Sequence, residues 1–290
     1  MMAGRQPREA RRKRAVSTAS KEKKQARRGN VLVTGASSGI GLELARIFAA
    51  EGFDLVLVAR RGPSLSVVAN ELENRHGCRA VVIPCDLTTP GGAKSLLSAV
   101  RRRRLDIDVL VNNAGVVLVD RFVENSFDEQ MELIALNVTA VAALARLFAA
   151  EMVKRRSGRI LNVASVAAFQ PTPWLALYGA SKAFVLSLSE SLSIELAETG
   201  VTVTALCPGF TDTPLLTGAK KTLRRPNLVP SVLTLDTVKV AREGYEACMA
   251  GRTICISGLP YELAVYWERF QPRWLVRSLG SLLLGKRFHT

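Results

Sequence analysis

The sequence predicts an α/β domain built on a parallel, doubly wound sheet with helices on both faces. Short apolar runs alternate along the chain with longer segments in which apolar residues recur at helical spacing. The strand-like runs are apolar throughout, which is typical of strands buried on both faces. The 290 residues, of which 48% are hydrophobic, suffice for one large α/β domain or two small ones.

The first predicted strand, Val31-Leu32-Val33, leads directly into a glycine-rich turn and a helix. The turn reads Thr34-Gly35-Ala36-Ser37-Ser38-Gly39-Ile40-Gly41. Gly35 permits a tight turn, Gly39 lets the backbone approach a pyrophosphate, and Gly41 lets the helix pack against the strand. The helix N-terminus adds N–H groups and a positive dipole end. This strand–turn–helix context predicts dinucleotide binding, although the spacing is GxxxGxG instead of GxGxxG.

The second predicted strand, Asp54 to Arg61, favours a phosphorylated cofactor. At the end of this strand an acid would bind the ribose 2′-OH of NAD, whereas an arginine accommodates a 2′-phosphate. Here Ala59 is followed by Arg60 and Arg61, so the sequence predicts NADP(H) rather than NAD(H). The alternative is that both arginines are solvated charges after a strand.

Polar or small residues also follow the third and fourth predicted strands. Ala80–Cys85 precedes Asp86-Leu87, where the carboxylate either accepts from an adenine amino group or caps the following helix. Val109–Val111 precedes Asn112-Asn113-Ala114-Gly115, in which amides can fix the neighbouring backbone and small residues leave room for a flat ligand.

A phenol and an ammonium form the candidate acid–base unit. Tyr178 and Lys182 lie four residues apart in a helix-compatible segment, so they share a helix face, and the charge of Lys182 would lower the pKa of Tyr178. Ser165 ends the strand Arg159–Ser165, thirteen residues upstream. Asn137 falls on the apolar stripe of a predicted helix, 128–152, where its amide must find hydrogen-bond partners. An ordinary surface pair and a structurally satisfied asparagine are the alternatives.

A lid over the site is predicted between the last two strands. Val201–Cys207 ends at Pro208-Gly209-Phe210-Thr211-Asp212-Thr213, and residues 214–235 mix Gly, Pro and basic residues with scattered leucines. A helix is expected over 238–249 and a final strand over 253–257.

In their order and spacing, these motifs resemble those of the short-chain dehydrogenase/reductase family over residues 30–258. The resemblance implies a Rossmann-type sheet of seven parallel strands with helices on both faces. It also implies that Tyr178 is the general acid in reduction and that Lys182 lowers its pKa and holds the nicotinamide ribose. Ser165 would polarise the substrate carbonyl, and Asn137 would anchor a water in a proton relay through Lys182.

The resemblance also assigns cofactor contacts and an oligomeric state. Thr213 matches the position that contacts the nicotinamide carboxamide, and Thr211 stands where the family often has a β-branched aliphatic residue. Relatives that prefer NADP often carry a basic residue where this chain has Ser38, so the NADP(H) prediction rests on Arg60 after Ala59. A homodimer or homotetramer would pair helices 128–152 and 181–198. The assigned cofactor contacts are Gly35, Ser37, Ser38, Gly39, Ile40, Gly41, Arg60, Arg61, Asp86, Leu87, Asn113, Ala114, Gly115, Tyr178, Lys182, Pro208, Gly209, Thr211 and Thr213.

Composition limits the alternatives. Residues 1–29 carry eleven of the Lys and Arg residues against two acids, so much of the net charge of +15 belongs to a basic arm, predicted to be disordered, rather than to the domain 30–258. Five dispersed cysteines and two histidines predict no disulfide framework, no metal site and a reducing, cytoplasmic compartment. The sequence contains no run of 18 apolar residues, so no transmembrane helix is predicted. A specific nucleic-acid site is not expected either.

The extension 259–290 mixes aromatic residues, leucines and cations. It is either an extra helix over the substrate cleft or a partner subunit, or an amphipathic helix that joins the basic arm at an anionic membrane surface. The predicted activity is interconversion of a carbonyl and a secondary alcohol on an apolar, steroid-like or long-chain acyl substrate. The alternative function is a non-catalytic redox sensor or scaffold that binds a dinucleotide.

Overall fold

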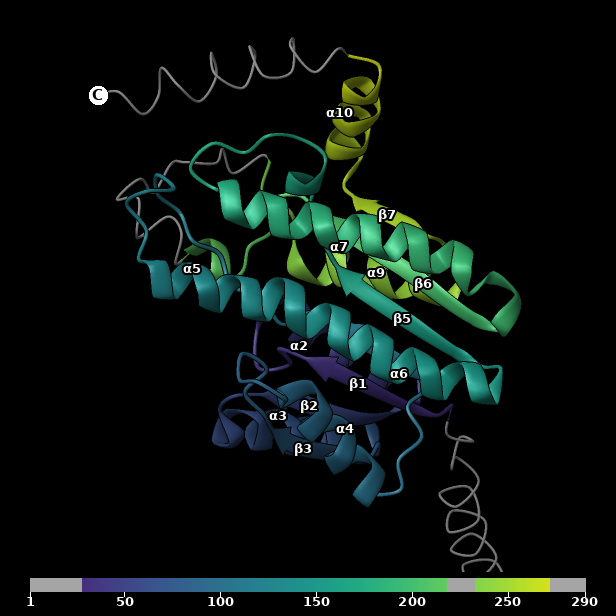
Figure 1. Ribbon diagram of the computed structural model, residues 1–290. Coiled ribbons are helices and arrows are strands. Elements are labelled where there is room, and N and C mark those ends of the chain that lie inside the picture. Colours follow the sequence, from purple (N-terminus) through teal and green to yellow (C-terminus); the bar gives the residue numbers. More distant parts are fainter. Residues whose placement is uncertain (1–27, 218–232, 272–290) are drawn as a thin grey trace, which may run out of the picture.

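The computed structural model describes residues 28–217 and 233–271 and contains a seven-stranded sheet (Figure 1). Neighbouring strands are parallel throughout, in the order β3-β2-β1-β4-β5-β6-β7. The strands are β1 (Asn30–Thr34), β2 (Asp54–Ala59), β3 (Ala80–Pro84), β4 (Val109–Asn112), β5 (Gly158–Val163), β6 (Val201–Pro208) and β7 (Ile254–Ser257). This arrangement confirms the predicted fold class. β2 ends at Ala59, so Arg60 and Arg61 lie just beyond the sheet.

Helices cover both faces of the sheet because successive strand residues point to opposite sides. Val31 and Val33 of β1 belong to the core beneath α2 (Gly39–Ala50), α3 (Gly62–His76) and α9 (Thr237–Met249). Leu32 belongs to the core on the other face, beneath α4 (Gly92–Arg102) and α6 (Val141–Arg155). α7 (Ala176–Glu195) runs beside α6 on that second face (Figure 1).

The helix predicted over 128–152 consists of three parts. α5 (Phe127–Ile134) leads into a π-helical segment, η1 (Ala135–Ala140), which continues as α6. The stretch Phe127–Arg155 is long and apolar enough to cross a membrane by length and composition alone. Leu144, Phe148 and Met152 of α6 are nevertheless buried in the core, as expected for a core helix of an α/β sheet.

A buried row of polar side chains joins two central strands to α7. Asn112 of β4 donates from Nδ2 to Asn162 Oδ1 of β5 at 2.9 Å, and the two residues are register partners. Asn162 donates to Ser189 Oγ of α7 at 2.9 Å, and Ser189 donates to Val185 O. The three side chains are at most 3% exposed, so the row fixes α7 to the sheet through hydrogen bonds in the core.

The remaining described elements are one helix after the sheet and two short helices within the domain. The sheet is followed by α10 (Leu259–Arg269), which projects from the end of β7 in Figure 1. Two short 3-10 helices, η2 (Val166–Ala168) and η3 (Ala197–Thr199), follow β5 and α7. The basic arm up to residue 27, most of the predicted lid (218–232) and the rest of the extension (272–290) lie outside the described residues.

Candidate active site

The glycine turn forms a close-fitting cradle at the carboxyl end of β1. Gly35 and Gly39 have φ values of +67° and +57°, in the left-handed region that favours glycine. A Cβ on Gly41 would lie 2.3 Å from Asn113 Nδ2 and 2.5 Å from Gly35 O, so any side chain there would collide with the turn. The spacing of these glycines is therefore required by the packing of α2 against β1 and β4.

Thr34 and Asn113 hold this turn in place. Thr34 Oγ1 accepts from the backbone N–H groups of Asn113 and Ala114, both at 3.0 Å. Asn113 donates in return to Thr34 O at 2.9 Å and to Gly35 O at 3.3 Å. Ser38 precedes α2 without a side-chain capping bond, so the first N–H groups of the helix remain available. A dinucleotide pyrophosphate fits this cradle, since the N–H groups at the start of α2 have no side-chain cap and the glycines keep the turn free of side chains of their own.

The remaining predicted cofactor contacts fall on both sides of the cradle. Thr213 lies next to Gly39, whose Cβ would be 3.3 Å from Thr213 Cγ2. Asp86 accepts from the N–H and hydroxyl of Thr88, which lowers the pKa of its carboxyl; the positive charge of Arg60 adds to the effect. These bonds close a local turn ahead of α4, so Asp86 does not cap that helix. The Leu87 side chain is buried in the core on the α4 face of the sheet.

Asn137 ties the loop after β4 to α7. Its Oδ1 accepts from Val116 N at 3.0 Å, and its Nδ2 donates to Val116 O at 2.9 Å and to Ser181 Oγ at 3.2 Å. The side chain is only 1% exposed, so its hydrogen-bond partners must come from the protein, and both of its polar atoms have them. Asn137 lies in the π-helical segment η1. Segments of this kind often occur at functional sites.

Ser165, Tyr178 and Lys182 meet where β5 and α7 come together. Lys182 Nζ lies 5.7 Å from the centroid of the Tyr178 ring and donates to Val163 O of β5 at 2.8 Å. Ser165 Oγ accepts from Ala167 N at 3.2 Å and lies 3.5 Å from Pro208 O, and it is close enough to Tyr178 to influence the pKa of the phenol. A Cβ on Gly115 would be 3.6 Å from Lys182 Nζ and 3.2 Å from Asn137 Oδ1, so β4, η1 and α7 converge here.

The electrostatics of the pair differ from the prediction that Lys182 lowers the pKa of Tyr178. Burial raises the pKa of Tyr178, and the nearby Ser165 side chain opposes the rise only in part. Burial also lowers the pKa of Lys182 to about 8. Both shifts have the same cause, since a buried site disfavours a charge of either sign. In the protein without cofactor, the prediction about Tyr178 was therefore wrong in direction.

Comparison with known proteins shows the family of the chain. A family model described as short chain dehydrogenase matches residues 29–224. The chain belongs to the short-chain dehydrogenase/reductase family. It is 34% identical to an oxidoreductase of Staphylococcus epidermidis over 206 residues, which cover 70% of this chain and 88% of that protein. It is 38% identical to a putative ketoacyl reductase of Streptomyces coelicolor over 192 residues, 66% of this chain and 73% of the relative.

A solved structure is similar over most of the domain. The short-chain dehydrogenase from Sphingobium yanoikuyae in complex with NADPH superposes with a TM-score of 0.75. The two are 33% identical, and the match covers 83% of this chain and 91% of that one. These matches confirm the family and the fold that the sequence predicts.

This short-chain dehydrogenase/reductase has a positioning residue that sequence reasoning missed. Tyr261 of α10 donates to Leu233 O at 2.7 Å and accepts from Phe210 N at 3.3 Å. A Cβ on Gly209 would lie 2.2 Å from its ring, so the absence of a side chain at Gly209 is what admits the tyrosine. Tyr261 thus holds together both ends of the segment that carries Thr211 and Thr213.

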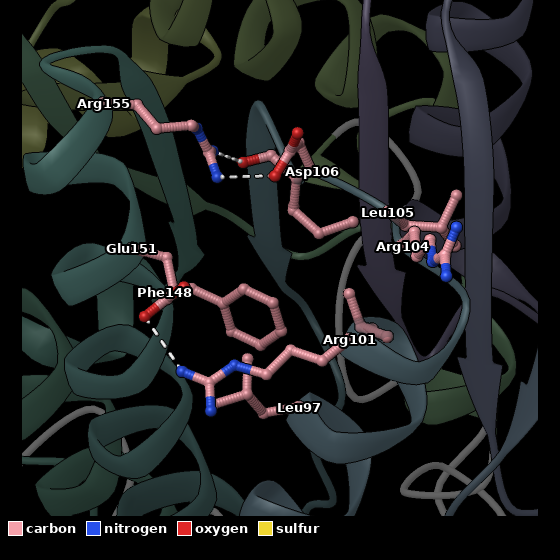
Figure 2. A pocket seen from close by; sticks show the side chains of 10 residues that line it. Leu97, Arg101, Arg104, Leu105, Asp106, Phe148, Glu151 and Arg155 are labelled. Carbon is pink, nitrogen blue, oxygen red and sulfur yellow. Dashed lines mark hydrogen bonds and ion pairs between the residues drawn. The ribbon is translucent and has the colours of Figure 1, made fainter.

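A separate hollow of about 220 Å³ lies at the opposite edge of this short-chain dehydrogenase/reductase (Figure 2). It is bounded by the C-terminal ends of α4 and α6, on the side of the sheet where strands begin. Figure 2 shows two of its three arginines paired with acids: Arg101 with Glu151 at 2.9 Å, and Arg155 with Asp106 at 3.3 Å. These pairs give the hollow a structural role, and none of the predicted site residues lines it.

Proposed function

We propose that this protein is an NADP(H)-dependent reductase that interconverts a carbonyl and a secondary alcohol on an apolar substrate. The observation that carries the proposal is the convergence of Ser165, Tyr178 and Lys182 beside the glycine cradle. A scaffold or sensor on the same fold would require the cradle alone, whereas a half-buried phenol close to a serine and a buried lysine can take part in proton transfer.

In this mechanism Tyr178 is the proton donor and Ser165 the second hydrogen-bond donor to the substrate oxygen. The bound dinucleotide supplies or accepts the hydride. Because burial raises the pKa of Tyr178, its phenol stays protonated at neutral pH, as an acid for carbonyl reduction must. Two donors, one two residues after β5 and one on α7, stabilise the negative charge that develops on the oxygen.

Lys182 and Asn137 support these donors in different ways. Lys182, with a pKa lowered to about 8, remains largely charged at neutral pH and places a positive charge behind the phenol. The Asn137 side chain is committed to Val116 and Ser181, so we assign it a positioning role. It holds the segment that contains Gly115 against α7, and any water of the proton relay would be held by other atoms.

The cofactor assignment rests on the end of β2. Arg60 and Arg61 follow Ala59 there, and β2 carries no acid at its end. The Sphingobium yanoikuyae relative was solved with NADPH, which supports the same choice here.

The substrate assignment rests on the surface beside Thr213. Phe210, Leu215 and Leu233 are 38–41% exposed there, so an apolar substrate would cover side chains that water now contacts. The name of the Streptomyces coelicolor relative supports a ketoacyl compound as one member of this class.

Replacement of one hydroxyl tests the proposal. We expect Tyr178→Phe to lower reduction of an apolar ketone or ketoacyl thioester by about 10²–10⁴-fold, measured by NADPH absorbance, while NADPH still binds. Tyr266→Phe makes the same chemical change at an exposed position on α10 and is the matched control. Retained activity in Tyr178→Phe would refute the mechanism. Dinucleotide binding by the wild type without turnover of any carbonyl compound would favour the sensor alternative.

We also propose two associations. α7 exposes Phe184 and Ile194, at 39% and 78%, and these side chains fit the interface of a homodimer or homotetramer. Light scattering of a Phe184→Glu, Ile194→Glu variant would show a smaller particle.

The compartment proposed is cytoplasmic, since all five cysteines lie in the described residues and are free.

The second association is with an anionic membrane surface. α10 exposes an apolar stripe at positions 259, 263, 266, 267 and 270, and the sequence 272–290 that follows has four Lys or Arg and no acid. We expect the protein to float with anionic liposomes and Trp267→Glu, Phe270→Glu to float less, with removal of residues 1–27 as a second arm. Equal flotation of all three proteins would count against attachment through these segments.

A further inference from the structure

An acid from a helix distant in the sequence forms an ion pair with the arginine that follows β2. Arg60 Nη1 lies 2.9 Å from Glu132 Oε1 of α5, although the two residues are 72 positions apart in the chain. The sequence around β2 contains no acid at its end, so cofactor choice read from that strand alone points to a 2′-phosphate. The fold brings an acid to the same place from another element.

The position of this pair is that of the adenosine end of the proposed cofactor. Arg60 follows β2, and its charge acts on Asp86 after β3, so the ends of two neighbouring strands and α5 converge. In dinucleotide folds the ribose 2′ position faces the end of the second strand. A carboxylate bound to Arg60 is then beside the site where a 2′-phosphate would bind.

We propose that Glu132 is a specificity-determining residue that weakens the preference for a 2′-phosphate by competing for Arg60. This inference rests on the proposed dinucleotide function. The charges of Arg60, Arg61 and Glu132 sum to +1, and without the acid they would sum to +2. A phosphomonoester carries about −1.5 to −2 at pH 7, so Glu132 both repels it and engages one of the guanidinium N–H groups that would bind it.

The exposure of the Arg60 and Glu132 side chains limits how much Glu132 can change the affinity for NADPH. The Arg60 and Glu132 side chains are 58% and 43% exposed, and ion pairs in such positions are weak. We therefore expect a change in affinity of about two- to fivefold, not a reversal of cofactor choice. NADH has no 2′-phosphate, so its affinity should not rise when the acid is removed.

Direct binding measurements test this proposal without turnover. Kd values for NADPH and NADH are measured from nicotinamide fluorescence for the wild type and Glu132→Gln. We expect Kd for NADPH to fall about two- to fivefold and Kd for NADH not to fall. Glu129→Gln, which removes an exposed acid one turn earlier on the same helix, is the matched control and should leave both values unchanged.

A second pair of variants tests the route through Arg60. In an Arg60→Met background, Glu132→Gln should improve NADPH binding less than it does in the wild type, because no guanidinium is released and only the direct repulsion is removed. An equal gain in that background would overturn the proposal, as would an unchanged or raised Kd for NADPH in Glu132→Gln alone. A wild type that binds neither dinucleotide would instead refute the proposed function and, with it, this inference.

Discussion

Substitution of Lys182 by Met tests how the fold holds a charge in its interior. The ammonium is 6% exposed, and burial lowers the pKa of Lys182 from 10.5 to about 8. One pKa unit corresponds to about 1.4 kcal/mol, so the folded, cofactor-free protein is destabilised by about 3 kcal/mol when Lys182 is protonated. The loss of the hydrogen bond to Val163 O offsets part of the gain from Lys182→Met, by about 1–3 kcal/mol.

The pH dependence separates these two effects because the lost hydrogen bond does not titrate. Below pH 8 both folded and unfolded chains carry the proton, and the cost of the buried charge is fully present. Between about pH 8 and 10.5 the folded protein releases the proton before the unfolded chain does, so the stability of the wild type rises with pH. In Lys182→Met this rise is absent.

The assay is urea denaturation of the cofactor-free proteins at pH 7, 8, 9 and 10. We expect the free energy of unfolding of the wild type, relative to Lys182→Met, to increase with pH by about 2–3 kcal/mol over this range. Lys94→Met, at an exposed position on α4, should show no such relative increase. Parallel pH profiles for the wild type and Lys182→Met would refute the reasoning, because they would mean that Lys182 has the same pKa in both states.

Three further substitutions test other parts of the site. Asn137→Ala should lower the free energy of unfolding by about 2–4 kcal/mol, because both backbone groups of Val116 lose their partner; urea denaturation measures the loss, and a cost below about 1 kcal/mol would contradict it. Gly41→Ala should weaken NADPH binding at least tenfold and destabilise the domain by about 1–3 kcal/mol, since its Cβ would meet Gly35 O; fluorescence titration and thermal unfolding measure these effects, and wild-type affinity would speak against the cradle. Tyr261→Phe keeps the ring but loses the hydroxyl, so the Phe210 amide should exchange its hydrogen about tenfold faster in NMR or mass spectrometry, and unchanged exchange would show that the bond to Tyr261 does not hold it.

Local pattern was sufficient for the sheet and for much of the site. The strand runs, the glycine turn and the amides after β4 each depend on residues near one another in the chain, and the structure places them together. Asn137 is an instructive case, since a lone amide on an apolar stripe must be satisfied, and its partners proved to be Val116 and Ser181.

Features that depend on tertiary contact were not predictable in the same way. The π-helical turn of η1 leaves the apolar periodicity of 128–152 almost unchanged, so the sequence reads as one helix. The pairing of Arg60 with Glu132 joins elements 72 residues apart. The pKa of Tyr178 depends on how deeply the phenol is buried, and the spacing to Lys182 contains no information about that depth.

The polar row from Asn112 through Asn162 to Ser189 has a consequence for assembly of the domain. An apolar interface alone tolerates sliding, because one leucine replaces another at small cost. If β5 slipped against β4, or α7 moved by one turn, these buried amides would face apolar neighbours and each would cost about 1–3 kcal/mol. The row thus disfavours misaligned packings of β5 and α7, the two elements that bring Ser165 and Tyr178 together.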